Sequence, residues 1–213
     1  TYNSLNVTPT ASKGIGFDAG ADDLAATFSG GSMTFIKKLT ASSSDNLSFV
    51  DGTSDVVLDN TYKEYMFIFN NIHPETDNSD FDFNISIDSG SNYNVAKTTT
   101  HVLIYHNEAG TATSLGYDTG EDLAQGTGFQ NLGDNVGNDN DQCLSGSLHL
   151  FNPSSTTFVK HFTSRTNLVT FHDYCVSGIV AGYANTTSAV DAVRFQMSAD
   201  AIDAGTISLY GIN

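Results

Sequence analysis

The feature that most limits the fold is an alternation of apolar and polar residues with a period of two. Across residues 80–87 the sequence DFDFNISI places an apolar side chain at every second position, and the sequence VRFQM repeats this pattern at 193–197. Successive side chains of a strand point to opposite faces of a sheet, whereas a helix would scatter these apolar positions around its axis. The alternation therefore predicts half-buried strands with one polar face.

About eleven segments have the alternation or composition of strands, and connections rich in Gly, Asn, Asp and Ser separate them. They are 34–39, 46–49, 65–72, 81–87, 101–105, 145–151, 157–164, 168–175, 179–184, 193–197 and 206–210. Many short strands joined by turn residues are typical of sandwiches and jelly rolls. We therefore predict an all-β fold, a jelly-roll-like antiparallel β-sandwich of about eleven strands with long polar loops.

Residues 1–31 differ from the rest because they contain many small residues and few large apolar ones, and they end in Gly30–Gly31. We predict an N-terminal arm or connecting segment over 1–31, with short strands at 4–7 and 14–17, and a sandwich domain over 32–213. Within that domain, 107–142 follows no regular pattern. We expect a long loop there, with one short turn of helix at 119–125.

The charge balance excludes several partners. The chain carries 8 basic and 24 acidic residues, a formal net charge of −16, and its isoelectric point is near 4.3. Such a field repels the phosphates of nucleic acids and the surfaces of anionic membranes. The longest apolar run, 65–69, is far shorter than the roughly 20 residues of a transmembrane helix. We expect no nucleic-acid partner and no membrane insertion.

The segment 131–142, NLGDNVGNDNDQ, is the richest polar cluster. Asp134, Asp139 and Asp141 are candidate ligands for Ca²⁺, which prefers oxygen donors, although the segment lacks the residue order of an EF-hand. The alternative is a turn in which Asn and Asp side chains bind their own backbone, with no cofactor.

A second motif, SIDSGSNY at 86–93, resembles the Asp-box, S-x-D-x-G-x-x-aromatic, of sialidases and other β proteins. Asp88 is expected to accept backbone N–H groups across the turn, and Gly90 to adopt a positive φ. We interpret it as a structural motif that stabilises a hairpin over 81–95.

The sequence contains few signs of catalysis. His106 with Glu108, and His172 with Asp173, are the closest acid–histidine pairs, but neither G-x-S-x-G nor H-E-x-x-H occurs. We therefore predict a non-enzymatic protein. The sequence does not exclude a pair of carboxylates for glycoside hydrolysis, because the fold sets the distance between them. Cys143 and Cys175 are expected to be free, half-buried thiols that are not bridged to each other.

Several stretches together resemble one group of proteins. They are YKEYMFIFNNIHPETD (62–77), SIDSGSNYNVAKTTT (86–100), YHNEAG (105–110), TGFQNLGDNVGNDNDQCLSGSLHLFNPSSTTFVKHFTSR (127–165), AGYANTTSAVDAVRFQMS (181–198) and GTISLYGIN (205–213). Over about 34–213 the chain resembles structural proteins of tailed bacteriophages, especially marine ones, which are described as tail-fibre-like or as virion proteins. The segment SKGIGFDAG, 12–20, is similar to the joints that precede C-terminal domains of phage fibres.

This resemblance implies a non-enzymatic virion protein on the exterior of the phage particle, assembled in the host cytoplasm, with other virion proteins as partners. The first interpretation is a tail-fibre or receptor-binding domain that contacts the host surface. The alternatives are a capsid decoration protein and a carbohydrate-active depolymerase. The resemblance also implies a homotrimer, in which residues 1–31 would cross to a neighbouring copy.

For a receptor-binding domain, the segment 106–142 and the rings beside it are the expected contact with a host-surface glycan. Tyr105, Tyr117 and Phe129 are the candidate binding residues. Aromatic rings stack on sugar faces, and Asn and Asp bind sugar hydroxyls. The alternative is that Tyr117 and Phe129 fix the segment to the sandwich.

Overall fold

The computed structural model describes residues 16–17, 24–25 and 32–213. Its contacts divide the chain into two compact units, Thr1–Met33 and Thr34–Asn213, and each is described by itself. In the first unit, β1 (Gly16–Phe17) pairs antiparallel with β2 (Leu24–Ala25). The strand predicted at 14–17 overlaps β1, whereas the one predicted at 4–7 lies outside the described residues.

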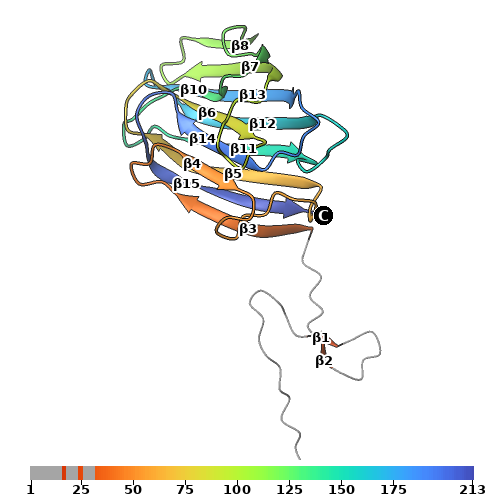
Figure 1. Ribbon diagram of the computed structural model, residues 1–213. Helices are drawn as coiled ribbons and strands as arrows, with labels where there is room; N and C mark the ends of the chain where they lie inside the picture. The colour runs from red at the N-terminus through yellow and green to blue at the C-terminus, as the bar shows by residue number, and fades with distance from the viewer. Residues whose placement is uncertain (1–15, 18–23, 26–31) are drawn as a thin grey trace, which may run out of the picture. The chain divides into compact units, whose positions relative to one another are not determined.

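The larger sheet of the second unit has nine strands (Figure 1). Their order is β3 (Met33–Thr40), β15 (Ile202–Ile212), β5 (Glu64–Pro74), β11 (Leu144–Phe151), β12 (Lys160–Val169), β13 (Tyr174–Ala184), β7 (Lys97–Asn107) and β8 (Thr113–Tyr117), while β9 (Ala124–Gly126) also pairs with β7. The consecutive strands β11, β12 and β13 are joined as hairpins, so the centre of this sheet is antiparallel.

The smaller sheet has four strands in the order β10 (Gln130–Val136), β6 (Ser79–Ser86), β14 (Ala192–Met197) and β4 (Leu47–Val50), all antiparallel. Each of these strands is preceded and followed in the sequence by strands of the larger sheet. The chain therefore crosses between the layers at every one of them, as in jelly rolls. The predicted all-β sandwich is confirmed, with no helix over 32–213.

The sandwich contains thirteen strands instead of about eleven because part of the segment 107–142 is also sheet. β8, β9 and β10 all lie where we predicted a loop, and the helical turn predicted at 119–125 is wrong. These strands form by pairing with β7 and β6 and have little alternation of their own.

The strand predicted at 168–175 is also wrong in its extent, because the chain turns back on itself there. Thr170 N–H donates to the Tyr174 carbonyl at 3.0 Å, and Asp173 N–H donates to the Thr170 carbonyl at 2.9 Å. Asp173 takes a φ of 60°, which Asp tolerates better than most residues. The segment is the tight turn between β12 and β13.

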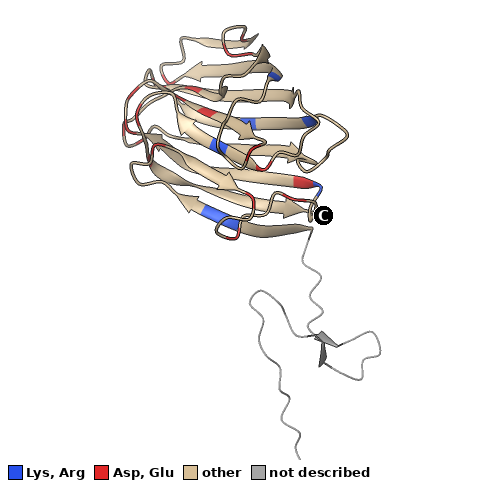
Figure 2. Ribbon diagram, viewed as in Figure 1, with Lys and Arg blue, Asp and Glu red and all other residues tan. Residues whose placement is uncertain are grey.

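Asn and Asp also occupy most of the other non-glycine positions of positive φ. Among the non-glycine residues with positive φ, most are Asn or Asp: Asp55, Asn71, Asn78, Asn135, Asn152, Asp173 and Asp200. Figure 2 shows that most acidic residues of the sandwich lie in the connections between strands. The polar composition therefore serves the connections, and the apolar residues are left for the strands.

The turn of the Asp-box has the predicted hydrogen bonds, but it does not join the two strands of a hairpin. Asp88 Oδ1 accepts the Asn92 N–H at 2.9 Å and the Ser86 hydroxyl at 2.7 Å, and Gly90 has a φ of 78°. However, the strands on its two sides, β6 and β7, belong to different sheets, so the predicted hairpin is wrong. These hydrogen bonds fix only the turn and do not dictate where the next strand pairs.

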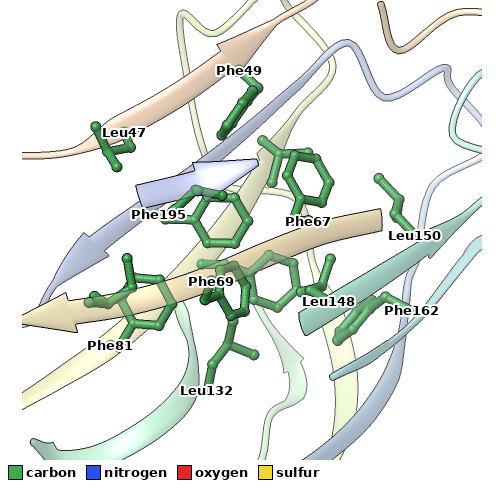
Figure 3. Packing of buried hydrophobic residues seen from close by; sticks show 14 of the residues in the cluster. Leu47, Phe49, Phe67, Phe69, Phe81, Leu132, Leu148, Leu150, Phe162 and Phe195 are labelled. Carbon is green, nitrogen blue, oxygen red and sulfur yellow. The ribbon is translucent and has the colours of Figure 1, made fainter. Parts of the chain in front are cut away.

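The core lies between the sheets and is built around Phe195 of β14 (Figure 3). Its ring centroid is 5.2 Å from those of Phe67 and Phe69 on β5, and 5.9 Å from that of Phe81 on β6. Phe195 also contacts the rings of Phe49 and Phe83. One fully buried side chain thus joins three strands of the small sheet to the centre of the large one.

We predict that Phe195→Ala lowers the free energy of unfolding by about 3–5 kcal/mol, since the surrounding rings cannot close the cavity. Chemical denaturation of both proteins measures this difference. Phe158→Ala is the matched control, because Phe158 is 69% exposed and its truncation leaves no cavity. Equal losses in the two variants would contradict the central role of Phe195.

Candidate functional site

A cleft among the described residues lies where β7, β10 and the β12–β13 turn meet. It has a volume of about 420 Å³. Its lining residues are Leu103, Tyr105, Asp134, Asn135, Thr170, Phe171, His172, Tyr174 and Val176. Four of these nine side chains are rings, those of Tyr105, Phe171, His172 and Tyr174, and Asp134 carries a carboxyl group. The cleft therefore combines flat ring faces with a few polar groups.

The aromatic wall consists of two ring pairs. Tyr105 and Tyr174 meet edge to face, with centroids 5.4 Å apart and planes at 75°. Phe171 and His172 lie side by side at the turn, 3.7 Å between centroids. Phe171 N–H donates to the Asn135 carbonyl at 3.2 Å, which ties the turn to β10. The rings are therefore held by backbone contacts before any ligand arrives.

The polar side of the cleft belongs to a group of carboxyls that we call the acidic cluster. Its members are Asp80 and Asp82 on β6, Asp118 and Glu121 in the β8–β9 connection, and Asp134 on β10. β6 and β10 are neighbours in the small sheet, and this pairing places Asp134 near Asp80, whose carboxylate accepts the Asn135 N–H at 2.9 Å. Asp134 is the member that lines the cleft.

Burial and mutual repulsion hold protons in this cluster. Burial raises the pKa of Asp82 to about 8, with further contributions from Asp80, Glu121 and Asp134. Burial, together with Asp80, raises the pKa of Asp134 to about 7, and burial raises the pKa of Glu121. No basic side chain of the described residues lowers any of these three pKa values. Asp134 can thus both donate and accept hydrogen bonds near neutral pH.

Two buried polar networks fix the connection that carries Glu121. The Gln130 amide donates to the Glu121 carbonyl at 2.9 Å and accepts the Thr99 hydroxyl at 2.6 Å. The Asn84 amide donates to the Thr127 carbonyl at 3.1 Å and accepts from the Lys97 ammonium at 2.6 Å. Since these groups are buried and paired, the connection is a fixed part of the sandwich.

The chemistry of the cleft favours binding. Rings and hydrogen-bonding groups can hold a hydroxyl-rich ligand. Glycoside hydrolysis uses two carboxyls about 5 to 9.5 Å apart, and the carboxyls of the acidic cluster are near enough to raise one another's pKa.

The structure brings one of the three predicted aromatic residues into the cleft. Tyr105 forms part of its wall. Tyr117 lies on β8, is 51% exposed, and donates its hydroxyl to the Asp122 carboxylate at 2.5 Å. Phe129 is half-buried in the connection between β9 and β10. The predicted surface at 106–142 is therefore split between the cleft and the outer edge of the sheet.

The three predicted Ca²⁺ ligands are not gathered. Asp134 belongs to the acidic cluster, whereas Asp139 and Asp141 are exposed in the β10–β11 connection. There Asp139 N–H donates to the Gln142 side chain at 3.3 Å, and Gln142 N–H donates to the Asp139 carbonyl at 2.9 Å, so a turn is present, but neither bond uses an Asn or Asp side chain. Within the described ranges, no three His, Cys, Asp or Glu side chains are placed to hold a metal ion. Calcium binding stays a prediction.

The cysteines and the histidine pairs are placed as follows. Both thiols are free, as predicted, and Cys143 is half-buried. The half-buried position predicted for Cys175 is wrong, because this residue is exposed where β13 leaves the turn. His172 is exposed at the turn, while the Asp173 carboxylate accepts from the Gln142 amide at 3.0 Å.

Sequence reasoning missed Phe171, His172 and Tyr174 as site residues because it assigned 168–175 to a continuous strand. The signal that could have found them is Asp173, a turn former between two β-branched runs. A turn there would have placed two aromatic residues and a histidine at the tip of a hairpin.

Comparison of the chain with protein-family models, with curated proteins and with solved structures finds no match. Within the part of the chain that the structure describes, no helix is long and apolar enough to span a membrane.

We predict that Asp82→Asn stabilises the protein at pH 8 and has little effect near pH 4. The folded-state pKa of about 8 lies above the ordinary value of 3.8, so the folded protein retains a proton that the unfolded chain releases. The contribution of Asp82 to stability is therefore lost as pH rises through this window, and asparagine removes that loss.

Melting temperatures between pH 4 and 9 measure this effect. The control is Asp139→Asn, which removes an exposed carboxylate outside the cluster and should leave the pH profile unchanged. If the Asp82→Asn protein melted lower than the original protein at pH 8, the proton assigned to Asp82 would be wrong.

Proposed function

We propose that this chain is a non-enzymatic structural protein of a tailed-phage virion, and that its sandwich is a tail-fibre or receptor-binding domain. The proposal rests on the resemblance given above and on one structural observation, the ring-lined cleft between β7, β10 and the β12–β13 turn. In this proposal the cleft holds a glycan of the host surface.

The geometry of the cleft supports a sugar as its ligand. Tyr105 and Phe171 offer flat apolar surfaces at low cost in side-chain entropy. Asn135 and Thr170 offer amide and hydroxyl groups beside them, and Asp134 offers a carboxyl that can act as donor or acceptor. Pyranose rings present apolar C–H faces and peripheral hydroxyls, so both features have a counterpart.

The charge of the cleft narrows the class of sugar. Asp134 stands beside Asp80, Asp118 and Glu121, with no basic side chain lowering its pKa. A sugar carrying a carboxylate or sulfate would add a further negative charge to this cluster, which costs Coulomb energy. The proposed ligand is therefore a neutral glycan.

This proposal is tested by binding to an array of neutral and acidic bacterial oligosaccharides, followed by calorimetric titration of any hit. We expect neutral oligosaccharides to bind, and His172→Ala to weaken binding about tenfold, the effect of losing one stacking ring. Because His172 is exposed, the melting temperature of the His172→Ala protein should equal that of the original protein. Phe158→Ala, an exposed ring outside the cleft, is the control.

Two outcomes would contradict the proposal. One is the absence of binding to every oligosaccharide of the array. The other is that Tyr117→Ala abolishes binding while His172→Ala does not, which would place the site on the edge strand β8.

A further inference from the structure

The strand β8 forms one edge of the nine-stranded sheet, and all five of its residues are exposed (Figure 1). It pairs with β7 on one side and has no neighbouring strand on the other side among the described elements. The outward backbone N–H and C=O groups of an edge strand are a template for pairing with another chain.

The two edges of this sheet differ in their protection. β3, at the opposite edge, carries Lys37 and Lys38, and charged side chains on an edge strand oppose pairing (Figure 2). β8 has the sequence TSLGY, with no charged residue and no proline. The chain therefore protects one edge of the sheet and leaves the other open.

The outer face beside this edge is apolar. Leu115, 71% exposed, stands opposite Ile104 of β7, and Tyr117 stands opposite Val102, which in turn stands opposite Ile179 of β13. Directly opposed residues share one face of a sheet, so these five side chains form a continuous strip across three strands. Ile104, Leu115, Tyr117 and Ile179 are all exposed.

The net charge limits where two copies of this chain can meet. Two copies of a chain with a net charge of −16 repel each other over most of their surfaces. An edge strand without charge is a place where they can meet with little repulsion. Antiparallel pairing of β8 with itself is also self-complementary, as a two-fold interface requires.

We propose that two copies of this chain associate through β8, edge to edge and antiparallel, so that their large sheets become one continuous sheet. In the symmetric register Leu115 of one copy lies opposite Leu115 of the other, and the two apolar strips join on one face. This contact is distinct from the glycan cleft and from any association through residues 1–31.

The test is the molar mass of the full chain, measured by light scattering and by sedimentation at micromolar to hundred-micromolar concentrations. We expect Leu115→Asp to halve the mass of the assembly, because it places two carboxylates opposite each other in the contact. Since Leu115 is exposed in the single chain, the melting temperature of the dissociated variant should show that it is still folded.

Phe158→Asp is the matched control, because it adds the same charge at a residue of similar exposure on the β11–β12 connection. It should leave the mass unchanged. The proposal is overturned if the original protein has the mass of one chain throughout this range. It is also overturned if Leu115→Asp leaves the mass unchanged, or if both variants reduce it equally. A mass reduced by deleting 1–31 and not by Leu115→Asp would assign the association to the N-terminal segment instead.

Discussion

Contacts among phenyl rings between the two sheets hold the sandwich together, and the other features depend on them. Phe195 contacts rings from β4, β5 and β6, so it fixes the small sheet over the centre of the large one. The connections contribute few side chains to this core, because most of their residues are polar. With the sheets so placed, β10 comes to lie against β12 and β13, and the Thr166 hydroxyl donates to the Leu132 carbonyl at 2.6 Å. The cleft exists because of that approach.

Between β7 and β10 the interior contains buried polar side chains, several of which contact their neighbours through hydrogen bonds instead of ring packing. Lys97 is fully buried and donates to the Asn84 side chain and to the Val95 carbonyl. Burial lowers the pKa of this ammonium to about 7. Such a network costs stability that apolar packing would not, yet Asn84 uses it to hold the β9–β10 connection through the Thr127 and Gly128 carbonyls. His101 and Asn131 are also buried there, and neither side chain makes a hydrogen bond.

How much of this could be predicted depends on whether a strand carries its own pattern. The strand β6 could be predicted because Phe81, Phe83 and Ile85 repeat on one face. The strand β8 could not, since its residues are exposed on both faces and owe their conformation to pairing with β7. The candidate site follows the same rule. Tyr105 was identifiable as a ring beside a polar segment, whereas the contact of Asp134 with Asp80 depends on the register of β10 against β6, which no local sequence encodes.

The scarcity of basic residues has consequences for both proposed contacts. Among the described side chains, the only basic group that lies beside a carboxylate is His73, with Nδ1 3.4 Å from Asp203 Oδ2, so the fold relies little on ion pairs. Its surface charge is therefore mostly repulsive, and salt weakens that repulsion over a distance of about 8 Å at physiological ionic strength. Stacking on rings and pairing of edge strands do not depend on long-range charge. A domain that binds through such contacts keeps its affinity as salt rises, while the repulsion between neighbouring acidic copies falls.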